Sequence, residues 1–184
     1  ETDMTPADRC QKIELILSDV DGVLTAGDVC YDNEGRESKC FNIRDGLGIK
    51  LWQRAGKTFG IVTGRQSKIV EIRARELGVA VVKQGVEDKL PMVLQIAGSL
   101  NLSLEQICYL GDDLPDLPVI ERVGLGIAVA DAAVDVRAAA HFTTALGGGA
   151  GAVREAIELI LRTQNRWGEI LAKYTTTTKG SEQA

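Results

Sequence analysis

The chain has 184 residues, a length that predicts one domain. Apolar residues make up 45% of it and aromatic residues only 4%, so the expected core consists mainly of Val, Ile, Leu and Ala. The net charge of −5 argues against a nucleic acid or an anionic membrane as partner. No segment is long and apolar enough to span a bilayer, and no signal-peptide pattern precedes the first apolar run, so a cytoplasmic enzyme is expected.

Short apolar segments alternate with amphipathic ones after a polar N-terminal arm, residues 1–11, that we expect to be loose. The predicted strands are residues 13–17, 29–32, 37–43, 59–62, 79–82, 107–110 and 125–129. The predicted helices are residues 46–55, 67–77, 89–100, 116–123 and 152–163. This alternation predicts a doubly wound, Rossmann-like parallel α/β sheet with a short β-hairpin insertion, and a C-terminal tail, residues 164–184, with a disordered end.

Three predicted strands end in polar residues that can carry chemistry. Asp19, Thr63 and Asp112 each fall at the carboxyl end of an apolar run. Ligands of parallel α/β sheets bind beyond these strand ends, so we expect the three residues to share one site.

Asp19 and Asp21 form the most informative pair. One carboxylate can attack phosphorus and form an aspartyl-phosphate, and a second can protonate the leaving alcohol and later activate water. The alternative is a solvated aspartate turn. A calcium-binding EF-hand loop does not fit, because Gly22 comes too early and Cys30 occupies the twelfth position, where glutamate is needed.

Two further segments suit a phosphate. Thr63 and Gly64 lie between a predicted strand and a helix, where a hydroxyl and backbone N–H groups can bind phosphate oxygens. Arg65 can reach an anionic substrate or remain solvated. Lys89 begins a predicted helix and can supply the fixed cation that a phosphorylated aspartate requires.

Asp112, Asp113 and Asp116 lie so close in sequence that a cation or hydrogen-bond donors must offset their repulsion. Mg²⁺ prefers oxygen ligands in octahedral geometry and retains several waters. Asp19, the Asp21 carbonyl, Asp112 and waters would satisfy it.

Other features are expected to be structural. The glycine-rich residues 147–151 resemble a dinucleotide loop only weakly, and a flexible connection is favoured. His141, the only histidine, and Trp52 are expected to support the fold. The four cysteines, Cys10, Cys30, Cys40 and Cys108, lack metal-ligand spacing and are expected to be buried free thiols. The alternative is that Cys30 and Cys40 face each other across the hairpin.

The ordered motifs resemble those of the haloacid dehalogenase (HAD) superfamily of aspartate-nucleophile phosphatases. Within it, residues 12–163 are similar to the 3-deoxy-D-manno-octulosonate 8-phosphate phosphatases. The segments that carry this resemblance are residues 19–25, 41–46, 63–65, 84–89, 111–113 and 151–155.

The resemblance implies Asp19 as nucleophile and Asp21 as acid/base. It implies that Thr63 and Lys89 bind the phosphoryl group, and that Asp113 and Asp116 support an Mg²⁺ held by Asp19, Asp21 and Asp112. It also implies a HAD-like core without a separate cap domain, in a homotetramer whose neighbouring subunits close each active site around a sugar-acid phosphate. One departure is Ala150, which stands where the family often has arginine.

Three alternatives remain open on the sequence. A phosphatase for a nine-carbon acid, 2-keto-3-deoxy-D-glycero-D-galacto-nononate 9-phosphate, would share the same motifs. A non-catalytic binding module of the same fold should have lost Asp19, Asp21, Lys89 or Asp112. A phosphoreceiver domain also uses aspartate, Mg²⁺ and lysine but would not need Asp21.

Overall fold

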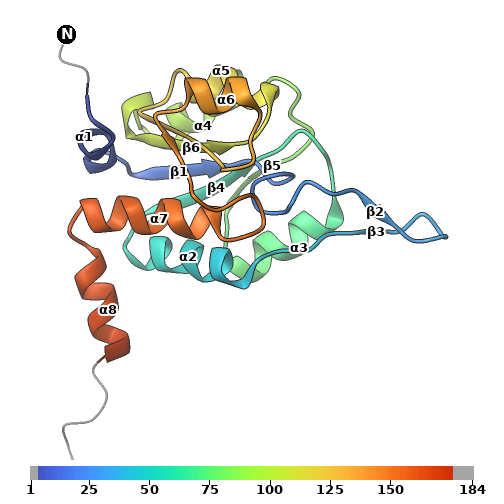
Figure 1. The fold of residues 1–184 in the computed structure, drawn as a ribbon, viewed down its shortest axis with the longest axis horizontal. Coiled ribbons are helices and arrows are strands. Elements are labelled where there is room, and N and C mark those ends of the chain that lie inside the picture. Colours follow the sequence, from blue (N-terminus) through green and yellow to red (C-terminus); the bar gives the residue numbers. More distant parts are fainter. Residues whose placement is uncertain (1–3, 176–184) are drawn as a thin grey trace, which may run out of the picture.

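The computed structural model describes residues 4–175 and places a six-stranded parallel sheet at the centre of the molecule, in the order β5-β4-β1-β6-β7-β8 (Figure 1). The strands are β1 (Leu15–Ser18), β4 (Thr58–Val62), β5 (Val81–Lys83), β6 (Ile107–Gly111), β7 (Leu125–Ala128) and β8 (Phe142–Thr143). The predicted parallel α/β class is therefore confirmed, and the described residues contain no separate cap domain.

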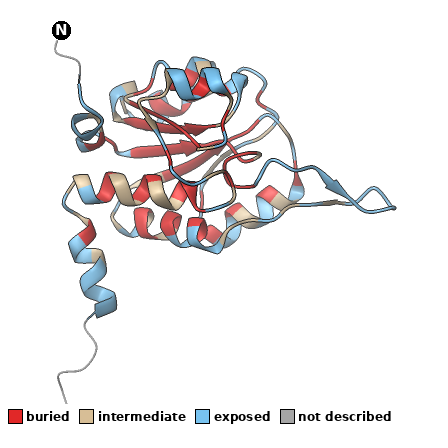
Figure 2. Cartoon of the chain, in the orientation of Figure 1, coloured by how far each residue is buried: buried red, intermediate tan, exposed pale blue. Residues whose placement is uncertain are grey.

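Helices cover both faces of the sheet. The elements α2 (Ile43–Arg54), α3 (Lys68–Leu77) and α7 (Ala152–Thr163) lie on one side. The elements α4 (Lys89–Ser99), α5 (Leu117–Ile120) and α6 (Val134–Ala139) lie on the other side (Figure 1). Because both faces are covered, β1 and β6 are buried along their whole length and β4 is buried after Thr58, which explains their largely apolar sequences (Figure 2).

β1 is the central strand of the core and pairs with both β4 and β6. Leu15, Ile16 and Leu17 are fully buried. A Cβ added at Gly60 of β4 would lie 2.7 Å from Leu17 Cδ2, so the glycine permits the close packing of these two strands. The packing fixes where β1 ends and hence where the polar residues begin.

The predicted hairpin is present but shorter than expected. It comprises β2 (Cys30–Tyr31) and β3 (Glu37–Ser38), which pair antiparallel and project from the body of the molecule (Figure 1). Asp32 closes the turn by accepting hydrogen bonds from the backbone of Glu34 and Arg36, both 2.9 Å. The prediction of a strand as far as residue 43 was wrong, because the chain leaves the ladder after β3 and Asn42 caps α2.

The N-terminal arm is not loose over its whole described length. Residues Pro6–Gln11 form helix α1, which begins with a capping box between Thr5 and Asp8. Cys10 is fully buried, and Arg9 Nη1 donates to the carbonyl of Gly124 at 2.9 Å. The sequence analysis missed this helix because the segment is mostly polar and buries one small residue, Cys10.

Helix α7 is not the last helix, because the predicted tail contains α8 (Trp167–Thr175). Trp167 is 6% exposed and its ring lies against the guanidinium groups of Arg154 and Arg162. The expected disorder after Thr175 lies outside the described residues. No helix within residues 4–175 has the length and apolar character needed to cross a membrane.

The remaining structural expectations have mixed outcomes. Trp52 is fully buried, and His141 accepts a hydrogen bond from the Gly126 backbone through Nδ1 at 2.8 Å, so both support the fold. All four cysteines are free thiols. Cys10 and Cys108 are buried, but Cys30 and Cys40 are exposed, because the hairpin has no apolar layer over it.

Candidate active site

The carboxyl ends of β1, β4 and β6 bring Asp19, Thr63 and Asp112 to one pocket of about 340 Å³, as the sequence predicts. The pocket also contains most of the other residues expected at the site. Its lining consists of Asp19, Asp21, Gly27, Thr63, Gly64, Arg65, Lys89, Asp112, Asp113 and Pro115.

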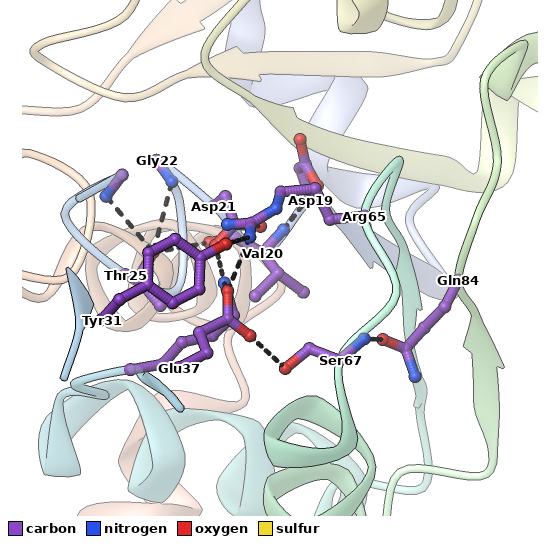
Figure 3. Close-up of polar contacts among 12 residues, drawn as sticks. Asp19, Val20, Asp21, Gly22, Thr25, Tyr31, Glu37, Arg65, Ser67 and Gln84 are labelled. Atoms are coloured by element: carbon purple, nitrogen blue, oxygen red, sulfur yellow. Dashed lines mark hydrogen bonds and ion pairs between the residues drawn. The ribbon is translucent and has the colours of Figure 1, made fainter. Parts of the chain in front are cut away.

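A tight loop presents Asp19 to this pocket. The Asp19 backbone continues the ladder by donating to Leu110 O at 3.0 Å, and its carboxylate Oδ1 accepts from the Val20 N–H at 2.6 Å. The Val20 carbonyl accepts the N–H of Thr25 at 3.1 Å, while Thr25 Oγ1 accepts from Gly22 and Gly27 (Figure 3). The loop therefore turns back on itself and fixes the direction of the Asp19 carboxylate.

Lys89 is the central cation of the site. Its side chain is 2% exposed, and Nζ lies 2.6 Å from both Asp19 Oδ2 and Asp116 Oδ1. Burial disfavours the charged ammonium, but the charges of Asp116 and Asp19 outweigh that effect and raise the pKa of Lys89. Lys89 therefore stays protonated as a fixed positive charge beside the Asp19 carboxylate.

Asp116 organises the surrounding backbone. Besides Lys89, its Oδ1 accepts from the hydroxyl of Tyr109 at 2.7 Å, and its Oδ2 accepts from the N–H groups of Asp112 and Asp113 at 2.9 and 3.3 Å. Four donors thus occupy this buried carboxylate, and two of them are backbone N–H groups of the acidic loop, Asp112 and Asp113. Tyr109 was predicted only as a strand residue; an aromatic hydroxyl two residues before the strand end is the signal that could have identified it.

Asp19, Asp112 and Asp116 each offer an oxygen within 4.8 Å of the others, an arrangement that can hold a metal ion. Burial is the main cause that raises the pKa of Asp112 to about 7, and the neighbouring charges of Asp116 and Asp19 contribute to the same shift. Burial and the charge of Asp116 also raise the pKa of Asp19, against the effect of Lys89. Because the Asp116 carboxylate already accepts from four donors, Asp19 and Asp112 are the carboxylates that could bind a divalent cation, which would offset the repulsion; these two oxygen ligands fit Mg²⁺.

Gly22 makes the close approach of Asp112 possible. Its φ is +88°, in the left-handed region that favours glycine, and a Cβ at this position would overlap the Asp112 carboxylate. The loop after β1 and the loop after β6 therefore meet at a point where no side chain fits.

The glycine-rich segment at residues 147–151 is not a flexible connection, contrary to expectation. Gly148 N donates to Asp131 Oδ1 and Gly149 N donates to Val23 O, both at 2.9 Å. A Cβ at Gly148 would overlap the Gly22 carbonyl. The glycines allow this turn to pack directly on the loop that carries Asp19.

The remaining predicted residues occupy the rim. Arg65 Nη2 lies 2.7 Å from Glu37 Oε1 in the hairpin, and Arg65 Nη1 lies 3.9 Å from Asp21 Oδ2 (Figure 3). Asp113 is exposed and accepts a hydrogen bond from the Leu114 N–H at 2.8 Å, which begins the turn leading to Asp116. Glu37 was missed by the sequence analysis because it belongs to the hairpin and not to a strand end of the sheet.

Known proteins resemble this chain in sequence and in fold. A family of haloacid dehalogenase-like hydrolases matches residues 77–157. The 3-deoxy-D-manno-octulosonate 8-phosphate phosphatase KdsC of Yersinia pestis is 43% identical over 158 residues, which cover 86% of this chain and 84% of that protein. The corresponding KdsC of Escherichia coli K12 is 41% identical over 88% of this chain and 86% of its own length.

Solved structures of phosphatases also have folds similar to that of this chain. A probable YrbI family phosphatase from Pseudomonas syringae pv. phaseolica 1448a superposes with a TM-score of 0.92 at 47% identity, covering 94% of this chain and 98% of that one. The 3-deoxy-D-manno-octulosonate 8-phosphate phosphatase from Moraxella catarrhalis, solved with a magnesium ion, a phosphate ion and a KDO molecule, superposes with a TM-score of 0.91 at 39% identity. That match covers 92% of this chain and 98% of the other.

Replacing Gly22 by alanine should displace Asp112 and weaken Mg²⁺ binding at least about 10-fold, as measured by titration calorimetry. The matched control is Gly35→Ala, because Gly35 also has a positive φ, +76°, but has no atom within 4 Å of an added Cβ. Both variants should lose about 1 kcal/mol of stability from backbone strain. Equal Mg²⁺ affinity in the two variants would contradict the role assigned to Gly22.

Replacing Asp116 by asparagine should lower the free energy of unfolding by about 3 kcal/mol, because Lys89 loses a buried partner and an amide would face N–H donors. Denaturant unfolding measures this loss. Asp113→Asn is the control: asparagine caps a turn as well as aspartate does, and the exposed site should change stability by less than about 0.5 kcal/mol. A similar small loss in both variants would show that Asp116 does not organise the loop.

Proposed function

Since the chain belongs to the haloacid dehalogenase-like hydrolases and, within them, to the family of 3-deoxy-D-manno-octulosonate 8-phosphate phosphatases, we propose that its pocket hydrolyses the phosphate monoester of this eight-carbon sugar acid. The observation that carries the proposal is the contact of the buried ammonium of Lys89 with the carboxylate of Asp19, at the end of the central strand. That pair provides a nucleophile and a fixed charge for a phosphoryl group.

The reaction has two steps. An Asp19 oxygen attacks phosphorus, the bond from phosphorus to the ester oxygen breaks, and protonated Asp21 gives its proton to the leaving alcohol. Asp21, now ionised, then takes a proton from water as the water oxygen attacks the aspartyl-phosphate, which releases inorganic phosphate and restores Asp19. Lys89, Thr63 and the Gly64 N–H hold the phosphoryl oxygens, and Lys89 opposes their growing charge.

Mg²⁺ fits the acidic part of the pocket. Asp19, Asp112 and the Asp21 carbonyl would hold it, with waters completing the shell, while Asp116 stays committed to its four donors. When bound, the ion neutralises phosphate charge and keeps Asp19 ionised. The Moraxella catarrhalis relative was solved with a magnesium ion, which supports this choice of metal.

The eight-carbon acid is the better supported substrate. The two KdsC relatives compared above carry its name, whereas the nine-carbon alternative rests on Ala150, where the family often has arginine. We propose that Arg65, which lines the pocket together with Lys89, contacts the anionic substrate. We assign the phosphatase domain to residues 12–163. The cytoplasmic location of the protein stays a prediction.

The direct test is a screen of sugar phosphates with and without Mg²⁺. The wild-type protein should release phosphate from 3-deoxy-D-manno-octulosonate 8-phosphate faster than from the nine-carbon 9-phosphate, and EDTA should abolish release until Mg²⁺ is added. Asp19→Asn should retain the fold, shown by an unchanged circular dichroism spectrum, and lose at least about 10⁴-fold in kcat. Full activity of that variant would refute the mechanism.

We also propose a homotetramer in which neighbouring subunits close the sites. The pocket lies at the surface, and the hairpin beside it exposes apolar side chains, with Val29 54% and Tyr31 61% exposed. Light scattering should therefore give the mass of four chains, and Val29→Glu should reduce both this mass and the activity. A fully active monomer would contradict the proposal.

A further inference from the structure

Lys39 has a nearly buried side chain, and the sequence analysis assigned it no role. Its side chain is only 1% exposed although it follows the exposed strand β3. Its ammonium contacts Asp21 Oδ1 and lies 3.5 Å from Glu37 Oε1. A lysine removed from water must be compensated by charged partners, so the positions of Lys39 and these two carboxylates depend on one another.

Glu37 fixes the other side of this contact. Its Oε1 accepts from Arg65 Nη2 at 2.7 Å and its Oε2 accepts from the hydroxyl of Ser67 at 2.9 Å. Ser67 is held in turn, since its N–H donates to Gln84 Oε1 at 2.8 Å (Figure 3). These hydrogen bonds attach the hairpin to the segment that leads into α3. They also fix the position of Glu37, next to which the Lys39 ammonium contacts Asp21.

The two carboxylate oxygens of Asp21 have different surroundings. Oδ1 is engaged by Lys39, while Oδ2 lies 3.9 Å from Arg65 Nη1, too far for a hydrogen bond. Asp21 lines the pocket and its side chain is 20% exposed, whereas Lys39 is absent from the pocket lining among the described residues. Lys39 therefore holds Asp21 Oδ1 from outside the pocket and leaves Asp21 Oδ2 available for proton transfer.

We propose that Lys39 is a positioning residue for the proton transfers of Asp21. The proposal rests on the function proposed above and adds a residue that acts through Asp21 without touching the substrate. The competing interpretation is that the Lys39–Asp21 contact only fastens the hairpin to the core. The two interpretations differ because a positioning residue matters only to steps that use Asp21.

The leaving group separates these steps. A sugar phosphate leaves as an alkoxide and needs the proton from Asp21, whereas nitrophenolate is stable enough to leave without one. Single-turnover rates of ester cleavage should therefore be measured with 3-deoxy-D-manno-octulosonate 8-phosphate and with 4-nitrophenyl phosphate, for the wild type, Lys39→Met and the control Lys12→Met. Lys12 is also paired with one glutamate, Glu105, but lies outside the pocket.

Lys39→Met should lower the rate with the sugar phosphate about 10- to 100-fold, leave KM within about twofold, and lower the rate with the nitrophenyl ester less than about threefold. Lys12→Met should change neither rate. If Lys39→Met does not fold, Lys39→Gln keeps a donor at this position and should show the same selectivity with a smaller loss. Equal losses with both esters would overturn the proposal.

The Asp21→Asn background provides a second, independent comparison. If Lys39 acts through Asp21, adding Lys39→Met to Asp21→Asn should change the single-turnover rate by less than about twofold. The same fold-loss in both backgrounds would show that Lys39 acts by another route. The wild-type turnover and its loss in Asp19→Asn test the proposed function separately, so a failure of the Lys39 proposal would be distinguishable from a failure of the function.

Discussion

The buried ion pairs of Lys89 are the interaction on which the site depends. One ammonium joins the end of β1, through Asp19, to the loop after β6, through Asp116. Each charge alone would be costly to bury, and the three are tolerated because they compensate one another and because Tyr109 and backbone N–H groups satisfy Asp116. The parallel sheet brings these groups together, and their mutual compensation then fixes their geometry.

The sequence predicted what local patterns encode. Asp19, Thr63 and Asp112 were placed together because each follows an apolar run, and the carboxyl ends of parallel strands share one edge of the sheet. The bounds of α7 were predicted correctly because its apolar residues keep a helical period from Ala152 to Thr163. The roles of the site residues came from the family resemblance and from the order of the motifs.

The features that the sequence analysis missed depend mostly on contacts between distant parts of the chain. The Gly148 turn packs on the Gly22 loop, 126 residues earlier by their numbers, and no composition rule distinguishes such a turn from a flexible linker. Asp45 accepts from the Arg154 N–H at 2.8 Å and so connects α2 to α7 across a separation of 109 residues. Helices α1 and α8 were missed because each is short and has one buried residue, Cys10 in α1 and Trp167 in α8, which is too few to give a helical apolar pattern.

The charges of the site form two groups with different structural origins. The inner group, Lys89 with Asp19 and Asp116, belongs to the sheet and its loops and is shielded from water. The outer group, Lys39 and Arg65 with Asp21 and Glu37, depends on the hairpin and borders the pocket rim. Changes in the hairpin can therefore alter how Asp21 and Arg65 meet a substrate without disturbing the nucleophile. Because the inner group makes no ion pair with the hairpin within residues 4–175, the nucleophile and its cation are held by the core alone.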